Sequence, residues 1–273
     1  MPLTCDLESK IEALWERTQM GYKICGQEKP VLDQVISLLN EGKVSSVKRS
    51  ENKDDPFHIC VWVKKAILLF FQATSTYSHS QEGIWWDKIS LLQLSRDTVV
   101  QRGIRIVPGA YVRQGVWLGH SVLVMPSFIN IGAFIDERTM IDSGTTVGSC
   151  AFIGKRCHIS SNVTIGGVLE PVQACPVIIG DDVFIGAGCH ILEGMYVESG
   201  SILGAGVILT SGTKIIDRTS GKIFFGKVPS GSVLVPGSYV CEKSGLSIHC
   251  AVVVKTVDHQ TRQKTQINDL LRV

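Results

Sequence analysis

Residues 129–165 read INIGAFIDERTMIDSGTTVGSCAFIGKRCHISSNVTI, and a branched aliphatic residue stands at every sixth position of this stretch. The same spacing returns between residues 179 and 215, after an interruption at residues 166–178. Glycine often follows the aliphatic residue, and a small side chain usually stands two positions before it. The aliphatic positions of the two runs are Ile129, Ile135, Ile141, Val147, Ile153, Ile159, Ile165, Ile179, Ile185, Ile191, Val197, Leu203, Leu209 and Ile215.

A period of six fits neither an α-helix, which repeats every 3.6 residues, nor a single strand, which repeats every two. It fits a short strand followed by a tight corner, with three such units closing one triangular coil. The aliphatic side chain then points into the prism, and glycine permits the corner at little steric cost. The pattern therefore predicts a mainly β fold, a parallel β-helix built from hexapeptide repeats.

The flanking segments lack this regularity. Residues 1–102 contain stretches with helical spacing, which predict a helical N-terminal domain that caps the end of the solenoid. We assign the β-helix to residues 103–222, with residues 166–178 as an extruded loop because Pro171 and Pro176 cannot both continue a ladder. Residues 223–273 are predicted to form a C-terminal β segment and a terminal helix.

The composition excludes several classes of function. A net charge of +2 over 273 residues gives no electrostatic reason to bind nucleic acid or an acidic membrane surface. We find neither a membrane-spanning run nor the apolar region of a signal peptide. The nine cysteines form no C-x-x-C pair, so neither a zinc ribbon nor a disulfide framework is indicated. We therefore expect a cytoplasmic protein with reduced thiols and no resident metal or cofactor.

The shape of the fold limits where chemistry can occur. A β-helix has a packed interior, so any site must lie on its faces, its corners or its extruded loop. Flat faces favour self-association, and a triangular prism suggests threefold packing, with clefts between neighbouring prisms as binding sites.

Three kinds of polar residue are candidates for such a site. Arg105 could bind a substrate carboxylate with two parallel hydrogen bonds, or it is an ordinary surface arginine. Asp136, Asp142 and Glu170 are candidate carboxylates, or merely solvated charges. The histidines at 120, 158 and 190 could share a zinc ion that activates water, although their phases in the repeat differ. Alternatively, a single histidine could act as a general base.

Several segments closely resemble the tetrahydrodipicolinate N-succinyltransferase family of the diaminopimelate and lysine pathway. The resemblance is strong from about residue 103 to 235 and weaker in the helical domain, where WVKKAILLFF and WWDKI carry it. Its most specific piece is IGGVLEPVQA within the interruption, because no rule of hexapeptide folding requires that sequence. The other matching segments are IRIVPGAYVRQG, MPSFINIGAFIDERTMID, TVGSCAFIGKRCHIS, FIGAG and SGTKIIDRTSGKIFFGKVPSGSV.

The resemblance implies a left-handed β-helix, a homotrimer with active sites between subunits, and an acyltransferase. The reaction would move the succinyl group from succinyl-CoA, a co-substrate, to the amine of the ring-opened dicarboxylate acceptor. Arg105 and Asp142 would contact the acceptor, with Asp142 also catalytic. The extruded loop and the C-terminal segments would help to enclose the substrate and the CoA arm.

The sequence departs from the family in two places. DSGTTVGS at residues 142–149 stands where the family has D-T-W-A-T-V-G-S, so Gly144 replaces a tryptophan. GAGCH at residues 186–190 stands where the family has G-A-R-S followed by a catalytic glutamate. Gly188 therefore replaces the arginine, and we assign His190 the glutamate's catalytic role because an imidazole can also accept a proton.

The departures keep other functions open. One is a hexapeptide acyltransferase with a different acyl donor or amine acceptor. A second is a zinc enzyme that uses the histidines, and a third is a trimeric scaffold without activity.

Overall fold

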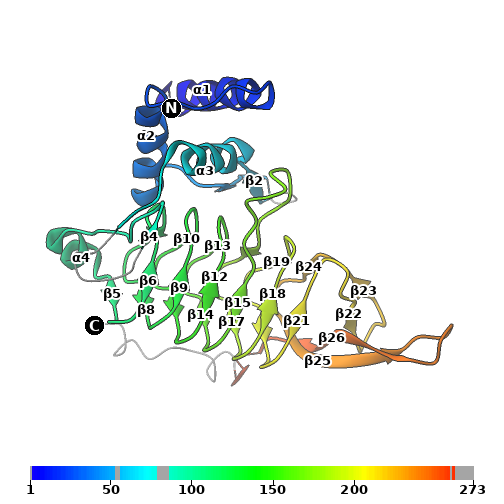
Figure 1. Ribbon diagram of the computed structural model, residues 1–273. Coiled ribbons are helices and arrows are strands. Elements are labelled where there is room, and N and C mark those ends of the chain that lie inside the picture. Colours follow the sequence, from blue (N-terminus) through cyan, green and yellow to red (C-terminus); the bar gives the residue numbers. More distant parts are fainter. Residues whose placement is uncertain (1, 53–55, 79–85, 259, 262–273) are drawn as a thin grey trace.

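The computed structural model of the protein describes residues 2–52, 56–78, 86–258 and 260–261. Its central element is a three-sided prism made of parallel two-residue strands, which Figure 1 shows from the side. The prism confirms the predicted parallel β-helix. The coil strands are β5 Arg105–Ile106, β6 Tyr111–Val112, β7 Trp117–Leu118, β8 Leu123–Val124, β9 Phe128–Ile129, β10 Phe134–Ile135, β11 Met140–Ile141, β12 Thr146–Val147, β13 Phe152–Ile153, β14 His158–Ile159, β15 Thr164–Ile165, β16 Ile178–Ile179, β17 Phe184–Ile185, β18 His190–Ile191, β19 Tyr196–Val197, β20 Ile202–Leu203 and β21 Ile208–Leu209.

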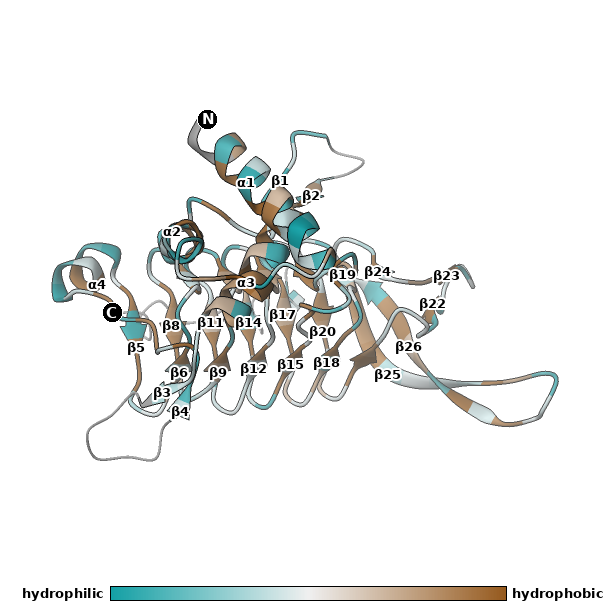
Figure 2. Ribbon diagram, turned by 45° about the horizontal axis from the view of Figure 1, so that its top comes forward, coloured by the Kyte–Doolittle hydropathy of each residue, from teal (hydrophilic) through white to brown (hydrophobic). Residues whose placement is uncertain are grey.

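The strand pairing explains the period of six. Ile141 pairs with Ile159, and Val147 pairs with Ile165, so each residue meets its neighbour in the next coil 18 positions later. Three hexapeptides therefore make one coil. The second residue of each coil strand from β7 to β21 points inward and is almost fully buried. Figure 2 shows these strands as an apolar row along the prism, with paler corners between them.

The two irregularities of the repeat are absorbed without loss of register. The corner between β8 and β9 is one residue short, yet Phe128 still pairs with Thr146. Residues 166–177 leave the coil after β15, and Ile178 then pairs with Phe152 as if no interruption had occurred.

The final repeat position behaves differently from the sequence prediction. Ile215 is buried, but β22 (Ile215–Asp217) pairs with β23 (Ile223–Phe224) and β26 (Ser247–Thr256) instead of extending the coil. The place beside Val197 is taken by β24 (Lys227–Val228). The cause is the turn after β22, where Asp217 accepts hydrogen bonds from the backbone N–H groups of Thr219 and Ser220 and reverses the chain.

The last coil is closed by a long hairpin. β25 (Ser232–Val240) begins by pairing in parallel with β20 and then pairs antiparallel with β26. Figure 1 shows this hairpin extending beyond the end of the prism. The predicted terminal helix falls largely on residues 262–273, outside the described residues.

The helical domain packs on the side of the prism, not on its end as the sequence predicted (Figure 1). Its core continues into Ile131 and Cys150, which lie at the corners before β10 and β13. The antiparallel pair of β1 (Val47–Arg49) and β2 (Phe57–Ile59) covers the face that contains β13 and β16, where Phe57 packs against Phe152 and Ile178. The elements before the coil are α1 Pro2–Gln19, α2 Lys29–Asn40, β1 Val47–Arg49, β2 Phe57–Ile59, α3 Val61–Ala73, β3 Tyr77–Ser78, β4 Trp86–Asp87 and α4 Arg96–Arg102.

No helix within the described residues has the length and apolarity needed to cross a membrane.

The prism interior should tolerate little loss of volume. Ile159 has no exposed surface and stacks between Ile141 and Ile185 of the neighbouring coils. The ladder fixes the coil spacing, so an Ile159→Ala cavity cannot collapse easily, and we expect a loss of about 3 kcal/mol in the free energy of unfolding. Urea denaturation measures this, with Ile159→Val as the control at about 1 kcal/mol. Equal losses for the two variants would contradict the tight-packing argument.

Candidate active site

Three sheets divide the outer surface of the prism. The Arg105 sheet contains β5, β8, β11, β14, β17 and β20, and the His190 sheet contains β6, β9, β12, β15, β18 and β21. The third sheet contains β7, β10, β13, β16, β19 and β24. The helical domain covers part of this third sheet. The predicted site residues lie on the other two sheets and at the corner that these two sheets share.

Arg105 lies in β5, the strand at one edge of the Arg105 sheet. It is the outward residue of β5, it is exposed, and it pairs with Leu123 of the next coil. Asp142 follows β11 at the corner that leads to the His190 sheet, and its Oδ1 accepts a hydrogen bond from the Ser143 N–H at 2.7 Å. The two strands β5 and β11 are separated by β8, so they lie about 10 Å apart at the usual strand spacing. Both side chains are accessible from outside the prism.

His190 is the outward residue of β18 and is half-buried. It stacks between Thr164 of β15 and Ile208 of β21. Two strand spacings, about 10 Å, separate β18 from β12, the strand that follows Asp142. The cysteine beside it points inward, where the Cys189 thiol donates to the Gly204 carbonyl at 3.1 Å and burial raises the pKa of the thiol.

A single chain does not bring the three predicted residues together. Arg105 lies on the first coil, Asp142 on the third and His190 on the fifth. They therefore spread over about 20 Å along the prism and over two of its faces. A site that uses all three requires side chains from a second copy of the chain.

The corner between Asp142 and His190 is nearly bare of side chains. Gly144 and Gly188 both occupy it with positive φ, at 73° and 68°. A Cβ added at Gly188 would meet nothing within 4 Å. At Gly144 an added Cβ would lie 2.2 Å from the Asn162 side-chain oxygen, so the Asn162 amide fills the space beside this glycine.

The sequence analysis did not single out Asn162. The signal that could have found it is its place in the repeat, at the left-handed corner position that glycine occupies in the coils on either side. Asparagine is among the few non-glycine residues that adopt this conformation readily.

The three histidines of the zinc hypothesis do not lie together on one chain. His158 lies on the Arg105 sheet, His190 on the next sheet, and His120 at the corner after β7. His158 makes an edge-to-face contact with Phe184, at 5.2 Å between ring centroids. Within the described part of the chain, no three histidine, cysteine or acidic residues are grouped closely enough to hold a metal ion.

The coil cysteines are poor candidates for a nucleophile. Cys150 and Cys157 are fully buried, and burial raises the pKa of each thiol to about 12. Both thiols are therefore neutral near pH 7 and have little nucleophilic character.

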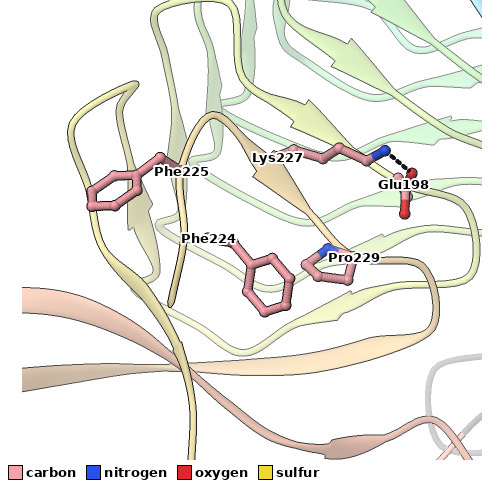
Figure 3. A pocket seen from close by; sticks show the side chains of 5 residues that line it. All are labelled: Glu198, Phe224, Phe225, Lys227 and Pro229. Atoms are coloured by element: carbon pink, nitrogen blue, oxygen red, sulfur yellow. Dashed lines mark ion pairs between the residues drawn. The ribbon is translucent and has the colours of Figure 1, made fainter. Parts of the chain in front are cut away.

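One pocket lies at the C-terminal end of the prism and has a volume of about 370 Å³ (Figure 3). The rings of Phe224 and Phe225 and the ring of Pro229 supply its apolar wall. Lys227 lies beside them and forms an ion pair with Glu198 at 2.5 Å. Lys227 also pairs with Tyr196 of β19, the strand that follows the His190 strand in the chain. The pocket therefore lies on the face next to that of His190, one coil closer to the C-terminal end of the prism.

Comparison with known proteins identifies the family. Residues 6–73 match the model described as tetrahydrodipicolinate N-succinyltransferase N-terminal, and residues 176–211 match the hexapeptide repeat of succinyl-transferase. A 2,3,4,5-tetrahydropyridine-2,6-dicarboxylate N-succinyltransferase of Wolbachia (Brugia malayi) is 44% identical over 97% of this chain and 98% of its own length. The chain belongs to the tetrahydrodipicolinate N-succinyltransferase family. Proteins of the same description from Caulobacter vibrioides and Rhodopseudomonas palustris are each 45% identical, over 98% and 100% of this chain and 99% and 100% of their own.

These matches confirm the family resemblance and, through the hexapeptide repeat, the left-handed β-helix that it implied. The N-terminal family model covers α1 to α3, so the helical domain is part of the family architecture although its sequence resemblance is weaker. The roles of Arg105, Asp142 and His190 remain predictions.

Proposed function

We propose that this protein transfers the succinyl group of succinyl-CoA to the amine of ring-opened tetrahydrodipicolinate, in the succinylase branch of diaminopimelate and lysine biosynthesis. The observation that carries the proposal is identity of 44–45% with curated N-succinyltransferases over nearly the whole of both chains. The exposed Arg105 and the two outward groups Asp142 and His190 are the residue types that such a reaction needs.

The chemistry follows from the charges of the reactants. The acceptor has two carboxylates, and Arg105 offers a planar cation that can bind one of them bidentately. Asp142 orients the acceptor amine, and His190 accepts its proton, because an imidazole can act as a base near neutral pH. The free amine attacks the thioester carbonyl carbon, the C–S bond breaks, and the proton passes to the departing thiolate.

The proposed active unit is a homotrimer. The supporting observation is the spread of Arg105, Asp142 and His190 over five coils and two faces of one chain, which a neighbouring prism could bridge. The His190 sheet also presents exposed apolar side chains, Tyr111, Phe128 and Ile208. A face of this kind is suited to packing against another copy. We place the enzyme in the cytoplasm, where the nine free cysteines would stay reduced.

The deciding experiment incubates the purified protein with succinyl-CoA and 2-aminopimelate and follows release of the CoA thiol. We expect thiol release that depends on both substrates, together with a succinylated product detected by mass spectrometry. Thiol release no faster than without acceptor would refute the proposal. Release with acetyl-CoA but not succinyl-CoA would instead support a different acyl donor.

The pocket at the C-terminal end suits the nucleotide part of the donor. CoA carries an adenine ring and phosphates, and the pocket offers phenylalanine rings beside a lysine. Stacking of a base on an aromatic side chain contributes about 1–3 kcal/mol in nucleic-acid complexes. We therefore assign the adenine ring of succinyl-CoA to this pocket, because the Glu198 carboxylate that pairs with Lys227 disfavours a phosphate there.

Removal of the exposed Phe225 ring should weaken donor binding alone. For Phe225→Ala we expect the KM for succinyl-CoA to rise roughly tenfold, as loss of one stacking contact implies. The succinyl thioester of N-acetylcysteamine has no nucleotide, so its kcat/KM should not change. Ile223→Ala, at an exposed position in β23 two residues before Phe225, is the control. Equal effects on both donors would show that the pocket does not bind the nucleotide.

A further inference from the structure

Lys64 is a fully buried lysine near the start of α3. Its Nζ donates hydrogen bonds to the carbonyl oxygens of Ala174, at 2.7 Å, and Pro171, at 3.4 Å. Both acceptors belong to the extruded loop, more than 100 residues away in the chain. The lysine therefore links the helical domain directly to the loop.

No carboxylate within the described residues is bonded to Lys64. The nearby Cys150 thiol is neutral, since burial raises its pKa to about 12. Burial accordingly lowers the pKa of Lys64. A buried ammonium held only by carbonyl dipoles adds little to stability, and an apolar side chain of similar length often serves a core as well or better. Fold stability alone does not account for a lysine at this position.

The loop has few other connections. The Val168 N–H donates to the Ser149 carbonyl at the start of the loop, at 3.1 Å, and Leu169 packs against the helical core. From Leu169 to Cys175, the hydrogen bonds that reach the described loop from outside come from Lys64. At its far end the loop packs closely against the coil. A methyl group added to Gly194 would lie 2.8 Å from the Cys175 carbonyl oxygen.

The loop begins beside the predicted catalytic histidine. It leaves the coil after β15, and the outward Thr164 of that strand pairs with His190. Gly166 donates its N–H to the Ile191 carbonyl at 2.7 Å, and a methyl group added to Gly166 would meet Leu192 at 3.1 Å. A change in the path of the loop would therefore alter the wall next to His190.

We propose that Lys64 is a positioning residue that ties the helical domain to the extruded loop and so fixes the wall of the acceptor site beside His190. The tether itself rests on the contacts of Lys64. Its consequence for substrate binding rests on the proposed function.

The first arm of the test needs no activity. In Lys64→Met, amide hydrogen exchange of residues 168–175 should accelerate at least tenfold, while the melting temperature stays within a few degrees of the wild type. Lys64→Arg should restore part of the protection because it keeps a donor. Lys65→Met is the matched control, since the neighbouring Lys65 pairs with Glu12 away from the loop. Unchanged exchange in Lys64→Met would refute the tether. If Lys64→Met does not fold, unchanged exchange in Lys64→Gln would refute it instead.

The second arm measures kinetics. We expect Lys64→Met to raise the KM for 2-aminopimelate roughly tenfold with kcat within about threefold of the wild type, and Lys64→Arg to recover part of the loss. Accelerated exchange with unchanged KM would overturn the link to the acceptor site. Absence of succinyl transfer in the wild-type protein would count against the proposed function and leave the exchange result to decide the tether.

Discussion

His190→Ala should lower kcat for succinyl transfer by a factor on the order of 10² to 10³, with a much smaller effect on the KM for succinyl-CoA. The reason is that an ammonium cannot attack a thioester, and a positioned base contributes about 10² to 10⁴ to such reactions. The imidazole lies on a regular strand of the prism and is half-buried, so its loss should not unfold the coil. Steady-state assays at saturating donor, with melting curves for each variant, measure the effect.

Two further variants identify what the imidazole does. His120→Ala removes an exposed histidine from another corner of the prism and should leave kcat unchanged. His190→Glu introduces the residue type that the resemblance assigns to this place in the family, and it should retain a large part of the activity. An ordinary carboxylate protonates about two pH units below an ordinary imidazole. The acidic limb of the pH–rate profile should therefore move to lower pH in His190→Glu. Near-normal turnover in His190→Ala would remove this residue from the mechanism.

The period of six was sufficient to predict the prism because the interior of each coil is a single layer of aliphatic side chains. Ile135 and Ile153, for example, stand 18 positions apart, pair in neighbouring coils and are both fully buried. The same reasoning was wrong at Ile215, which keeps the spacing but leaves the coil. The turn formed by Asp217 decides this, and its effect on pairing depends on β26, some 30 residues further along the chain.

The position of the helical domain could not be predicted from periodicity. Ile131 and Cys150 are corner residues of the repeat, and nothing in their spacing shows that they belong to the core of another domain. Lys64 posed the same difficulty. It stands beside Lys65 in a helical pattern, which is typical of a solvated face, yet it is buried against a loop whose contact with α3 is fixed only in three dimensions.

The sequence predicted which residues belong to the candidate site, but it did not predict how these residues are arranged in space. The motifs around Arg105, Asp142 and His190 identify positions in a family, and the coil then separates these positions by about 20 Å along one chain. The sequence predicted threefold packing but not which residues face a neighbouring copy, because the outward residues of a sheet look alike whether solvent or another prism covers them. Tyr111 and Phe128 illustrate this, since both follow the repeat and remain exposed in one chain.

Arg105→Met should raise the KM for 2-aminopimelate by a factor on the order of 100, with little change in the KM for succinyl-CoA. Removal of one partner from a charge-assisted pair costs about 2–5 kcal/mol, and an arginine can bind a carboxylate through two parallel hydrogen bonds. Arg105 is exposed at the first coil strand, so the melting temperature should change little. Arg105→Lys keeps the charge but loses the planar pair of donors, and we expect an intermediate KM.

A second acceptor shows whether Arg105 recognises the distal carboxylate. 2-Aminoheptanoate has the chain length of 2-aminopimelate but lacks that carboxylate. The wild-type enzyme should prefer 2-aminopimelate strongly, and Arg105→Met should lose most of this preference because the interaction that separates the two acceptors is gone. If Arg105→Met lowers kcat/KM equally for both acceptors, the guanidinium acts elsewhere, for example on the carboxylate beside the amine. If neither acceptor is affected, Arg105 is a surface residue, and the acceptor must be held by a cation elsewhere in the proposed homotrimer.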